Sequence, residues 1–448
     1  MRNIGISLFA FAAFAASAAG PRFISGDGIS MTQDPATRRV TVTYSLSEEP
    51  GIVTFAVQTN AGDSVWVPIG GEAVSCVYGD VNRIVTNTTT PSSFVWIPDD
   101  TWPDRVIADG TLRCVVSVWP TNDPPDYIVV DRIPGGISYY ANAESIPGGV
   151  TNEVYRHGKF LLRRIHATGA RFTMGSPIDE PGRGVVETTI KETPHRVTLT
   201  NDYYMGVFEV TQDQWRMVTT FWNAYFYFTN LPYSAELPLT GVDYDEIRGA
   251  VTSDGDKWSP DNPLSVAHKV KSTSFMGCLR SLTDIDFDLP TEAEWEFACR
   301  AGTSGNFYNS GLRALEDLDK IAWYAGNSSS ADRNLVDSPA SYLGNGAGCI
   351  PHIPGQKEPN AFGLYDMLGN VFELCLDASQ YDLGFEPATA PMGPAAPESG
   401  TARIMRGGSH DFGWEYCRAA QRHWTTRNSH KTYNGFRLSC PCPPTKKW

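Results

Sequence analysis

The stretch "DLPTEAEWEFACRAGT", residues 288–303, decides the fold of the larger part of this chain. Thr291 and Glu294 have the spacing of a capping box, in which each side chain accepts a hydrogen bond from the other residue's backbone N–H. Over the next turn Trp295, Ala298 and Cys299 fall on one face, which we expect to be buried. The sequence around this helix is rich in Trp and Gly and shows few helical patterns. It therefore predicts a loop-rich domain organised around one well-defined helix.

The amino-acid composition is that of an ordered, acidic protein. The chain has 448 residues, of which 41% are hydrophobic and 12% aromatic, and its formal charge is −14. No run of basic residues interrupts this acidic background, so nucleic acid and anionic membranes are poor candidate partners. The length exceeds the size at which a single core stops growing, which predicts two domains.

The N-terminus, "MRNIGISLFAFAAFAASAAG", has the pattern of a secretory signal peptide over residues 1–19. Its apolar run is too short to span a bilayer, and no other stretch reaches the roughly 18 apolar residues that spanning requires. We therefore expect a secreted or periplasmic protein without membrane insertion. That compartment permits disulfides, although nine cysteines are an odd number and leave at least one unpaired within the chain.

Residues 22–140 have the pattern of a β-sandwich of the immunoglobulin or fibronectin type. Apolar and polar residues alternate over 40–46 and 112–118, and Gly, Pro, Asn and Asp clusters separate the short strands. Cys76 and Cys114 fall in predicted strands, either as a pair or as two buried free thiols. We expect this domain to be a spacer or adhesion module without a site of its own.

Two further regions follow the sandwich. Residues 141–158 contain several glycines and few periodic apolar positions, which predicts a linker. Residues 159–442 form the second domain, in which another helix is expected over 265–282.

Five ordered segments of the second domain carry a family resemblance. They are "FTMGS" (172–176), "HRVTLTNDYYMGVFEVTQDQW" (195–215), "LPTEAEWEFACRAGT" (289–303), "NAFGLYDMLGNVFEL" (360–374) and "RGGS…CRAAQR…NGFRL" (406–438). Together they resemble the formylglycine-generating enzyme family, also called sulfatase-modifying factor domains. The resemblance implies an α+β, C-type-lectin-like fold, loop-rich and often held by calcium and disulfides.

A calcium site is expected in "YDMLGNVFE" (365–373). Asp366 and Glu373 offer carboxylate oxygens, which calcium prefers, and Gly369 allows a tight turn. The matching family segment implies Asp366, Gly369, Val371 and Glu373 as ligands. The alternative is that the two carboxylates only accept hydrogen bonds in a packed turn.

Copper and oxidase chemistry are not expected. The resemblance implies that oxidising members hold copper with two thiolates just after the GGS turn, and soft Cu(I) prefers such ligands. Here "HDFGWEY" (410–416) follows Ser409 and contains no cysteine. Cys417 remains, and one hypothesis makes it a nucleophile activated by His410, His423 and Glu415.

The other hypothesis makes Cys417 a disulfide partner. The resemblance implies that Cys299 pairs with Cys417 and that Cys278 pairs with Cys440. It leaves open the pairing of the other five cysteines: Cys76, Cys114, Cys349, Cys375 and Cys442.

Two functions of different class follow. The first is a secreted binding protein that recognises a carbohydrate, a peptide or a surface partner on a lectin-like scaffold. The second is a formylglycine-generating oxidase, or a related sulfatase-modifying enzyme, with a divergent active site. Zinc chemistry has no support because the sequence contains neither HExxH nor CxxC.

Overall fold

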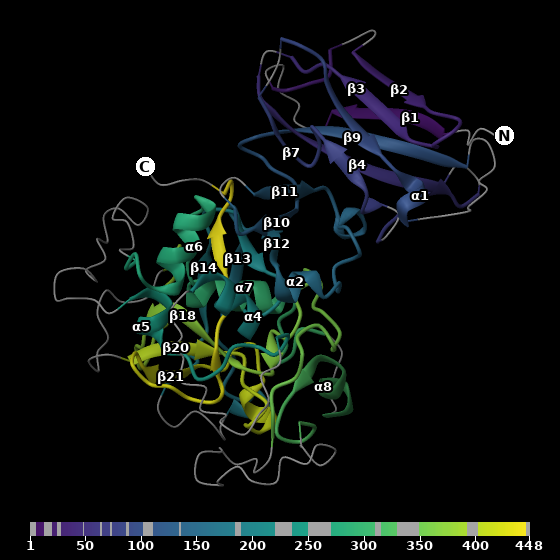
Figure 1. The fold of residues 1–448 in the computed structure, drawn as a ribbon. Coiled ribbons are helices and arrows are strands. Elements are labelled where there is room, and N and C mark those ends of the chain that lie inside the picture. Colours follow the sequence, from purple (N-terminus) through teal and green to yellow (C-terminus); the bar gives the residue numbers. More distant parts are fainter. Residues whose placement is uncertain are drawn as a thin grey trace. The chain divides into compact units, whose positions relative to one another are not determined.

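The computed structural model describes residues 6–12, 20–24, 28–47, 49–62, 65–71, 74–86, 89–101, 111–133, 136–183, 190–219, 235–249, 270–309, 315–328, 349–391 and 402–444. The chain divides into two compact units (Figure 1). Unit 1 comprises Met1–Val130 and Ile137–Tyr155, and unit 2 comprises Asp131–Gly136 and Arg156–Trp448.

Unit 1 consists of two β-sheets that share one core. The first sheet has the order β1 (Ile6–Ala12), β9 (Leu112–Pro120), β4 (Gly51–Asn60) and β5 (Trp66–Ile69), and β7 (Arg83–Val85) also pairs with β4. The second has the order β2 (Ile29–Gln33), β3 (Val40–Tyr44), β8 (Ser92–Trp96) and β6 (Val77–Gly79). A short helix, α1 (Pro98–Thr101), follows β8, and β10 (Tyr127–Asp131) forms a hairpin with β11 (Ile137–Tyr140).

The alternating pattern of the sequence produces this shared core. Along β3 and β9 every second residue is buried, as the two-residue period of a strand requires. Phe55 of β4 lies 5.2 Å from Phe94 of β8, between ring centroids, so side chains of the two sheets interdigitate. Unit 1 is therefore an all-β sandwich.

Two segments, residues 6–12 and 141–158, bear on expectations from the sequence. Residues Ile6–Ala12, which lie within the expected signal peptide, form β1 and pair in parallel with β9. The expected linker at 141–158 contains a 3-10 turn, η2 (Ala143–Ser145), and the short helix α2 (Val154–His157). Ile146 and Tyr155 within it are buried, so this segment contributes side chains to the folded core rather than being fully exposed.

Unit 2 has short strands, short helices and long loops. In the part of unit 2 that the structure describes, the strands form four groups. The first contains β12 (Lys159–Ile165), β15 (Tyr203–Gly206) and β23 (Ser439–Pro441), and the second β13 (Arg171–Met174), β14 (His195–Thr198) and β19 (Ala388–Thr389). The third contains β21 (His423–Thr426), β20 (Ala402–Arg406), β18 (Phe372–Ala378) and β22 (Asn434–Gly435), and the fourth β16 (Ala322–Trp323) and β17 (Leu368–Gly369). The helices in its described residues include α4 (Gln212–Val218), α5 (Tyr244–Arg248), α6 (Phe275–Thr283), α7 (Glu292–Arg300) and α8 (Leu315–Ile321). This is the α+β, loop-rich architecture that the sequence predicts.

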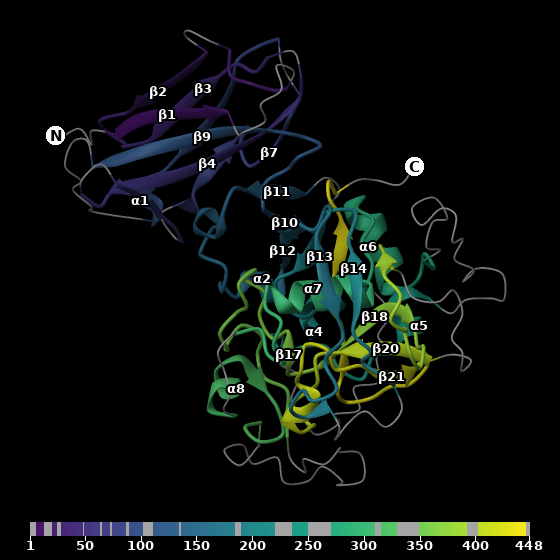
Figure 2. The ribbon, with the colours of Figure 1, turned by 180° about the vertical axis from the view of Figure 1, so that it is seen from behind.

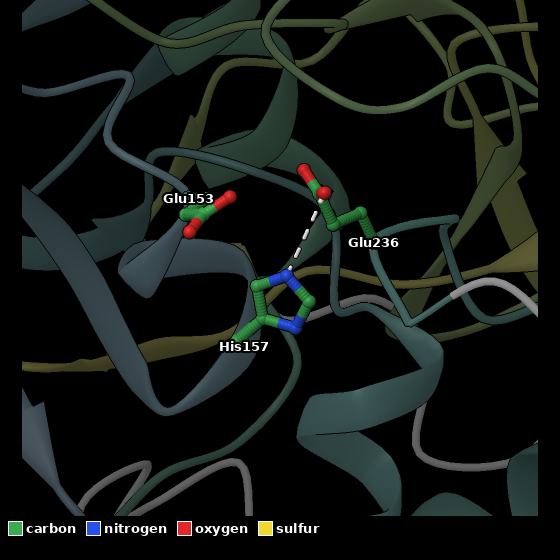
Figure 3. Close-up of side chains that lie close together, drawn as sticks. All are labelled: Glu153, His157 and Glu236. Carbon is green, nitrogen blue, oxygen red and sulfur yellow. Dashed lines mark ion pairs between the residues drawn. The ribbon is translucent and has the colours of Figure 1, made fainter.

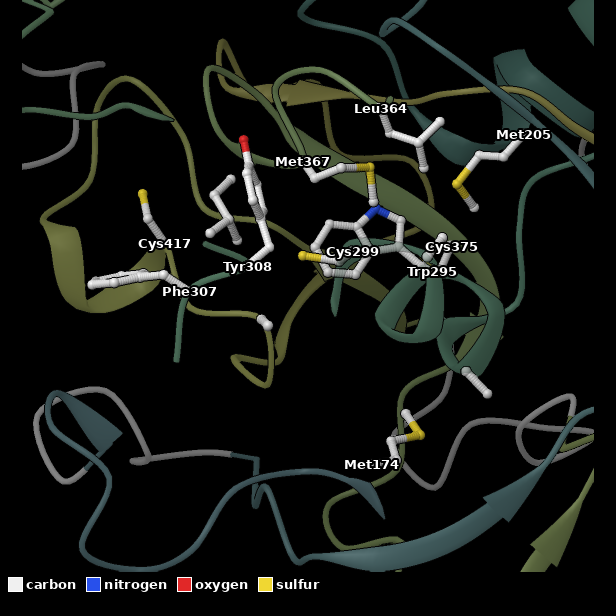
Figure 4. Close-up of a cluster of buried hydrophobic side chains, with 14 of the residues drawn as sticks. Met174, Met205, Trp295, Cys299, Phe307, Tyr308, Leu364, Met367, Cys375 and Cys417 are labelled. Carbon is white, nitrogen blue, oxygen red and sulfur yellow. The ribbon is translucent and has the colours of Figure 1, made fainter. Parts of the chain in front are cut away.

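Helix α7 lies at the centre of unit 2, where it packs against β13, β18 and β20 (Figure 2). The capping box forms as predicted: Thr291 Oγ1 accepts from Glu294 N, and Glu294 Oε2 accepts from Thr291 N at 2.9 Å. Trp295, Ala298 and Cys299 are fully buried. Figure 4 shows Trp295 in the core of unit 2, among Met367, Cys299 and Cys375.

The helix predicted over 265–282 is shorter than expected. Residues 265–269 lie outside the described residues, and α6 begins only at Phe275. Ser274 caps it, because its side chain accepts from Gly277 N, and this cap stops the helix from extending backwards. No helix of the described residues is long and apolar enough to cross a membrane.

Candidate functional site: an aromatic platform

The GGS turn fixes where the candidate site begins. The chain leaves β20 at Arg406, and Gly407 and Gly408 then take positive φ angles of 95° and 78°. A Cβ on Gly407 would lie 3.0 Å from Met367 O, and one on Gly408 would lie 2.8 Å from Cys417 Sγ. Both positions therefore need glycine, for the left-handed backbone and for close packing.

Five rings gather where the loop after this turn meets β18 and β21; we call this cluster the aromatic platform. Its members are Phe372, Phe412, Tyr416, His423 and Tyr433. Phe412 lies 4.8 Å from Tyr416, 4.9 Å from Tyr433 and 5.1 Å from Phe372, between ring centroids. These are the separations of favourable edge-to-face pairs. Phe372 is fully buried, whereas the other four residues are partly exposed, so the platform extends from the core to the surface.

Backbone hydrogen bonds hold the platform in place. Phe372 N donates to Tyr433 O at 2.8 Å, next to the parallel pairing of β18 with β22. Ala325 N donates to Phe412 O at 2.9 Å, and His423 is fixed opposite Met405 by the pairing of β21 with β20. The rings therefore belong to loops and strands that are tied to one another.

The platform carries no charge at neutral pH. Burial lowers the pKa of His423 to about 4, so its imidazole is neutral. Burial, followed by the nearby Asp411 carboxylate, raises the pKa of the Tyr433 hydroxyl. Burial and the Glu415 carboxylate do the same for Tyr416. The surface thus combines apolar rings with neutral groups that can donate and accept hydrogen bonds.

Cys417 sits beneath this loop and has no features of an activated nucleophile. It is fully buried, and burial, followed by the Glu415 carboxylate, raises the pKa of its thiol. His410 does not activate it, because His410 Nδ1 lies 2.7 Å from Asn370 O and burial lowers the pKa of that imidazole to about 4. A protonated, inaccessible thiol is a poor nucleophile.

All nine cysteines are free thiols in the structure, so neither expected disulfide is formed in it. Cys299 and Cys417 belong to the same core, and Figure 4 shows them on either side of the Tyr308 ring in that view. Cys278 on α6 is partly exposed, whereas Cys440 on β23 is buried. The two pairings remain predictions. Among the described residues, neither group of clustered metal-ligating side chains includes a cysteine, and the expectation against copper stays a prediction.

Four motif arginines hold the segment that bears the platform. Each guanidinium pairs with buried carboxylates, and a broken buried pair typically costs about 3–5 kcal/mol. The pairs are Arg406 with Glu296, Arg422 with Glu292 (Nε to Oε1, 2.6 Å), Arg418 with Glu180 (Nη1 to Oε1, 2.7 Å) and Glu192 (Nη2 to Oε1, 2.6 Å), and Arg437 with Glu373 (Nη2 to Oε1, 2.5 Å).

The residues expected to bind calcium fit an ion only in part. Both carboxylate oxygens of Glu373 accept hydrogen bonds from Arg437, and Trp295 Nε1 donates to its Oε2 at 2.6 Å. Asp366 differs: its Oδ2 accepts from Gly355 N at 2.7 Å, whereas its buried Oδ1 has no hydrogen-bond partner. Asp366 Oδ1 is therefore available to bind a cation, whereas both carboxylate oxygens of Glu373 are hydrogen-bonded to the Arg437 guanidinium.

A surplus of negative charge surrounds Asp366. Burial, followed by the charges of Asp366 and Glu373, raises the pKa of Glu209 well above its usual value. Burial raises the pKa of Asp366 to about 6, against the opposing effects of the Gly355 N–H and the Arg437 guanidinium. The buried carboxylates of Glu209, Asp366 and Glu373 thus lie near a single guanidinium, that of Arg437. This imbalance favours either protonation or a cation.

Another polar cluster surrounds His157 at the end of α2. Its Nε2 lies 3.6 Å from Glu236 Oε1 (Figure 3), and its Nδ1 lies 3.3 Å from Asp213 Oδ2. Arg156 Nε donates to Glu236 Oε2 at 3.1 Å, so a guanidinium already neutralises that carboxylate. This cluster is best explained as a set of structural contacts.

Sequence reasoning named His423 but missed Phe412, Tyr416 and Tyr433. A signal was present, because these aromatic residues lie in a segment too irregular to bury them by strand or helix periodicity. The buried ion pairs were also missed. Their signal was the recurrence of Arg in the last motif and of Glu292 and Glu296 at i,i+4 spacing on α7.

The central capped helix, the GGS turn and the loop-built surface define a C-type-lectin-like domain that follows an all-β unit. The chain belongs to the sulfatase-modifying factor family: residues 163–440, well over half of it, match the "Sulfatase-modifying factor enzyme 1-like domain". The family and fold expected from the five segments are thereby confirmed.

Relatives within this family have different names. The chain is 31% identical over 189 residues to a formylglycine-generating enzyme of Thermomonospora curvata, a match that covers 38% of this chain and 55% of that protein. It is 26% identical over 330 residues to the Bos taurus formylglycine-generating enzyme, covering 68% and 80%. It is 32% identical over 177 residues to the serine/threonine-protein kinase pkn1 of Chlamydia pneumoniae, covering 40% and 25%. The chain thus spans a quarter of that kinase and about half of the T. curvata enzyme.

A solved structure, Treponema denticola variable protein 1, is also similar. It is 25% identical and has a TM-score of 0.44, and the match covers 63% of this chain and 95% of that one.

Proposed function

We propose that this chain is a secreted binding protein that captures a neutral ligand, a carbohydrate or an uncharged peptide segment, on the aromatic platform. One observation carries the proposal. The loop after the GGS turn presents partly exposed rings where the oxidase pattern requires two thiolates, and its single cysteine is buried with a raised pKa.

The platform has the physical properties that such binding needs. Its rings offer apolar faces for sugar C–H groups or peptide side chains, and its neutral hydroxyls and imidazole can exchange hydrogen bonds with a ligand. Because backbone hydrogen bonds and buried ion pairs tie its loops down, little ordering entropy is lost on binding.

The expected site of action is outside the cytoplasm, supported by the pattern of residues 1–19. Calcium, where present, would be held on the Asp366 side of the buried carboxylates and would strengthen the scaffold beneath the platform.

Array binding tests the proposal. Purified full-length chain is applied to a glycan array and to a peptide array, and dissociation constants are then measured for the ligands found. Tyr416→Ala and Tyr433→Ala should each weaken binding at least ten-fold, about 1.4 kcal/mol or more, as loss of an aromatic anchor does.

Tyr381→Ala is the matched control. Tyr381 is also an exposed tyrosine, 51% accessible, but it lies outside the platform and contacts Lys191. Its removal should leave affinity unchanged. Equal losses in Tyr381→Ala and Tyr433→Ala, or no loss in either platform variant, would exclude the platform as the binding surface.

The alternative is catalysis with a divergent site, favoured by the relatives that are named formylglycine-generating enzymes. It is tested by incubating the protein with a CxPxR peptide, copper and oxygen. Aldehyde formed with turnover, and lost in Cys417→Ser, would replace binding with oxidase activity as the function.

A further inference from the structure

Three ligating side chains meet away from the platform. Asp243 is the N-cap of α5, Glu246 is the third residue of that helix, and His430 lies in the loop between β21 and β22. One ligand atom from each lies within 4.8 Å of the other two. Two of the residues are three positions apart in the sequence, whereas tertiary folding brings the third to them.

The two separations from His430 match those between ligands of one ion. His430 Nε2 lies 3.4 Å from Asp243 Oδ2 and 3.3 Å from Glu246 Oε2. Two ligands bound tetrahedrally to zinc at about 2.0–2.1 Å lie about 3.3–3.4 Å apart, since a tetrahedron's edge is about 1.63 times its centre-to-corner distance.

The capping box leaves the required atoms facing the cluster. Asp243 Oδ1 accepts from Glu246 N at 2.8 Å, which leaves Oδ2 for His430. Glu246 Oε2 accepts from Asp243 N at 3.2 Å, and a carboxylate oxygen has a second lone pair for a cation. The helix cap therefore positions both carboxylates without using up their capacity as ligands.

Burial and charge favour a cation at this point. The side chain of Asp243 is 6% exposed and that of Glu246 is 25% exposed, so both carboxylates lose much of their solvation on folding. The neighbouring Asp245 is already paired with Arg427, at 2.5 Å. The side chains of His430 and Glu246 are each 25% exposed, so an ion can enter and a water molecule can complete its coordination.

We propose that Asp243 Oδ2, Glu246 Oε2 and His430 Nε2 bind one divalent transition-metal ion of the zinc class, with water as the fourth ligand. Imidazole suits zinc, whereas calcium prefers oxygen ligands alone. The ion clamps α5 to the loop that ends at Tyr433. If the platform is the binding surface, as proposed above, this clamp steadies one of its rings.

Conservative variants can remove the ligands and keep the fold. Asp243→Asn preserves the N-cap, because Asn caps helices as well as Asp does. Glu246→Gln preserves the capping box, which accepts Gln at that position. His430→Gln removes the imidazole from a partly exposed loop.

Zinc binding by chelator-treated full-length protein is the test, measured by titration calorimetry and elemental analysis. We expect one Zn²⁺ per chain and a melting temperature that rises with zinc. Each of the three variants should bind at least ten-fold more weakly and lose that rise. Excess calcium should not displace the ion.

His157→Gln is the matched control, since it removes an imidazole from the other carboxylate-bearing cluster, and it should bind like wild type. Absence of zinc binding by wild type, or unchanged binding in Asp243→Asn and His430→Gln, would overturn the proposal. So would displacement by calcium. These readouts do not involve the platform ligand, so failure here leaves the proposed function standing.

Discussion

Replacing Asp366 by Asn should change how the stability of this protein depends on pH. Asp366 is buried, and burial raises its pKa from the usual 3.8 to about 6. Its φ of 53° lies in the left-handed region, which Asn tolerates best among residues with a side chain. Asn can also accept the hydrogen bond from Gly355 N that Oδ2 now accepts. The substitution therefore removes the charge with little change to the backbone.

The sign follows from proton linkage. Below pH 3.8 the carboxyl is protonated in both states, and its favourable contribution to folding is fully present. As pH rises toward 6 the unfolded chain releases its proton first, so the wild type loses stability through this window. The difference of about two pH units corresponds to about 3 kcal/mol, at 1.36 kcal/mol per unit. Relative to wild type, Asp366→Asn should gain up to that amount between pH 4 and pH 7.

Urea unfolding at several pH values, in the presence of chelator, measures this difference. Asp202→Asn is the control, because burial alone would raise the pKa of Asp202, yet hydrogen bonds from Thr168 and Arg164 hold it at about 2. That control should show a difference from wild type that is constant between pH 5 and pH 8. A constant difference for Asp366→Asn as well would refute the assignment of a raised pKa.

Excess calcium adds a second arm to the same experiment. An ion bound by Asp366 stabilises the ionised form, so calcium should raise wild-type stability at pH 7 and make Asp366→Asn the less stable protein. No calcium effect on either protein would exclude the calcium site and leave the protonated carboxyl as the explanation.

Two further predictions concern the segment around Cys417. Arg418→Met should lower the free energy of unfolding by about 3–5 kcal/mol, because it strands the buried carboxylates of Glu180 and Glu192; a loss below about 1 kcal/mol in urea unfolding would contradict this. Peptide mapping of unreduced protein secreted from an expression host should find Cys299 cross-linked to Cys417, as the family resemblance implies, whereas thiols alkylated in the unfolded, unreduced chain would show that they stay free as in the structure.

The capped helix could be predicted because its signal is local. Thr291 and Glu294 are three residues apart, and the apolar face of α7 follows from the 3.6-residue period. Strand alternation in unit 1 is equally local. The start of α6 was misplaced because apolar spacing alone does not show where a helix begins, and the deciding feature is the Ser274 cap.

The candidate site was harder to predict because its parts are distant in sequence. Arg418 and Glu192 are separated by 226 residues, and no periodicity links them. Glu373 looked like a calcium ligand from its neighbours, yet Arg437, 64 residues away, takes both its oxygens.

By itself the sequence determined the family, the order of the two units and the absence of paired thiolates after Ser409. These are properties of residue type and spacing along the chain. Only the tertiary structure decided that Cys417 is buried, that Phe412 and Tyr433 meet Phe372, and which carboxylates have guanidinium partners. Burial and long-range ion pairing determine the pKa values, and burial determines which aromatic residues stay exposed. Burial and pairing in turn depend on which distant segments pack together.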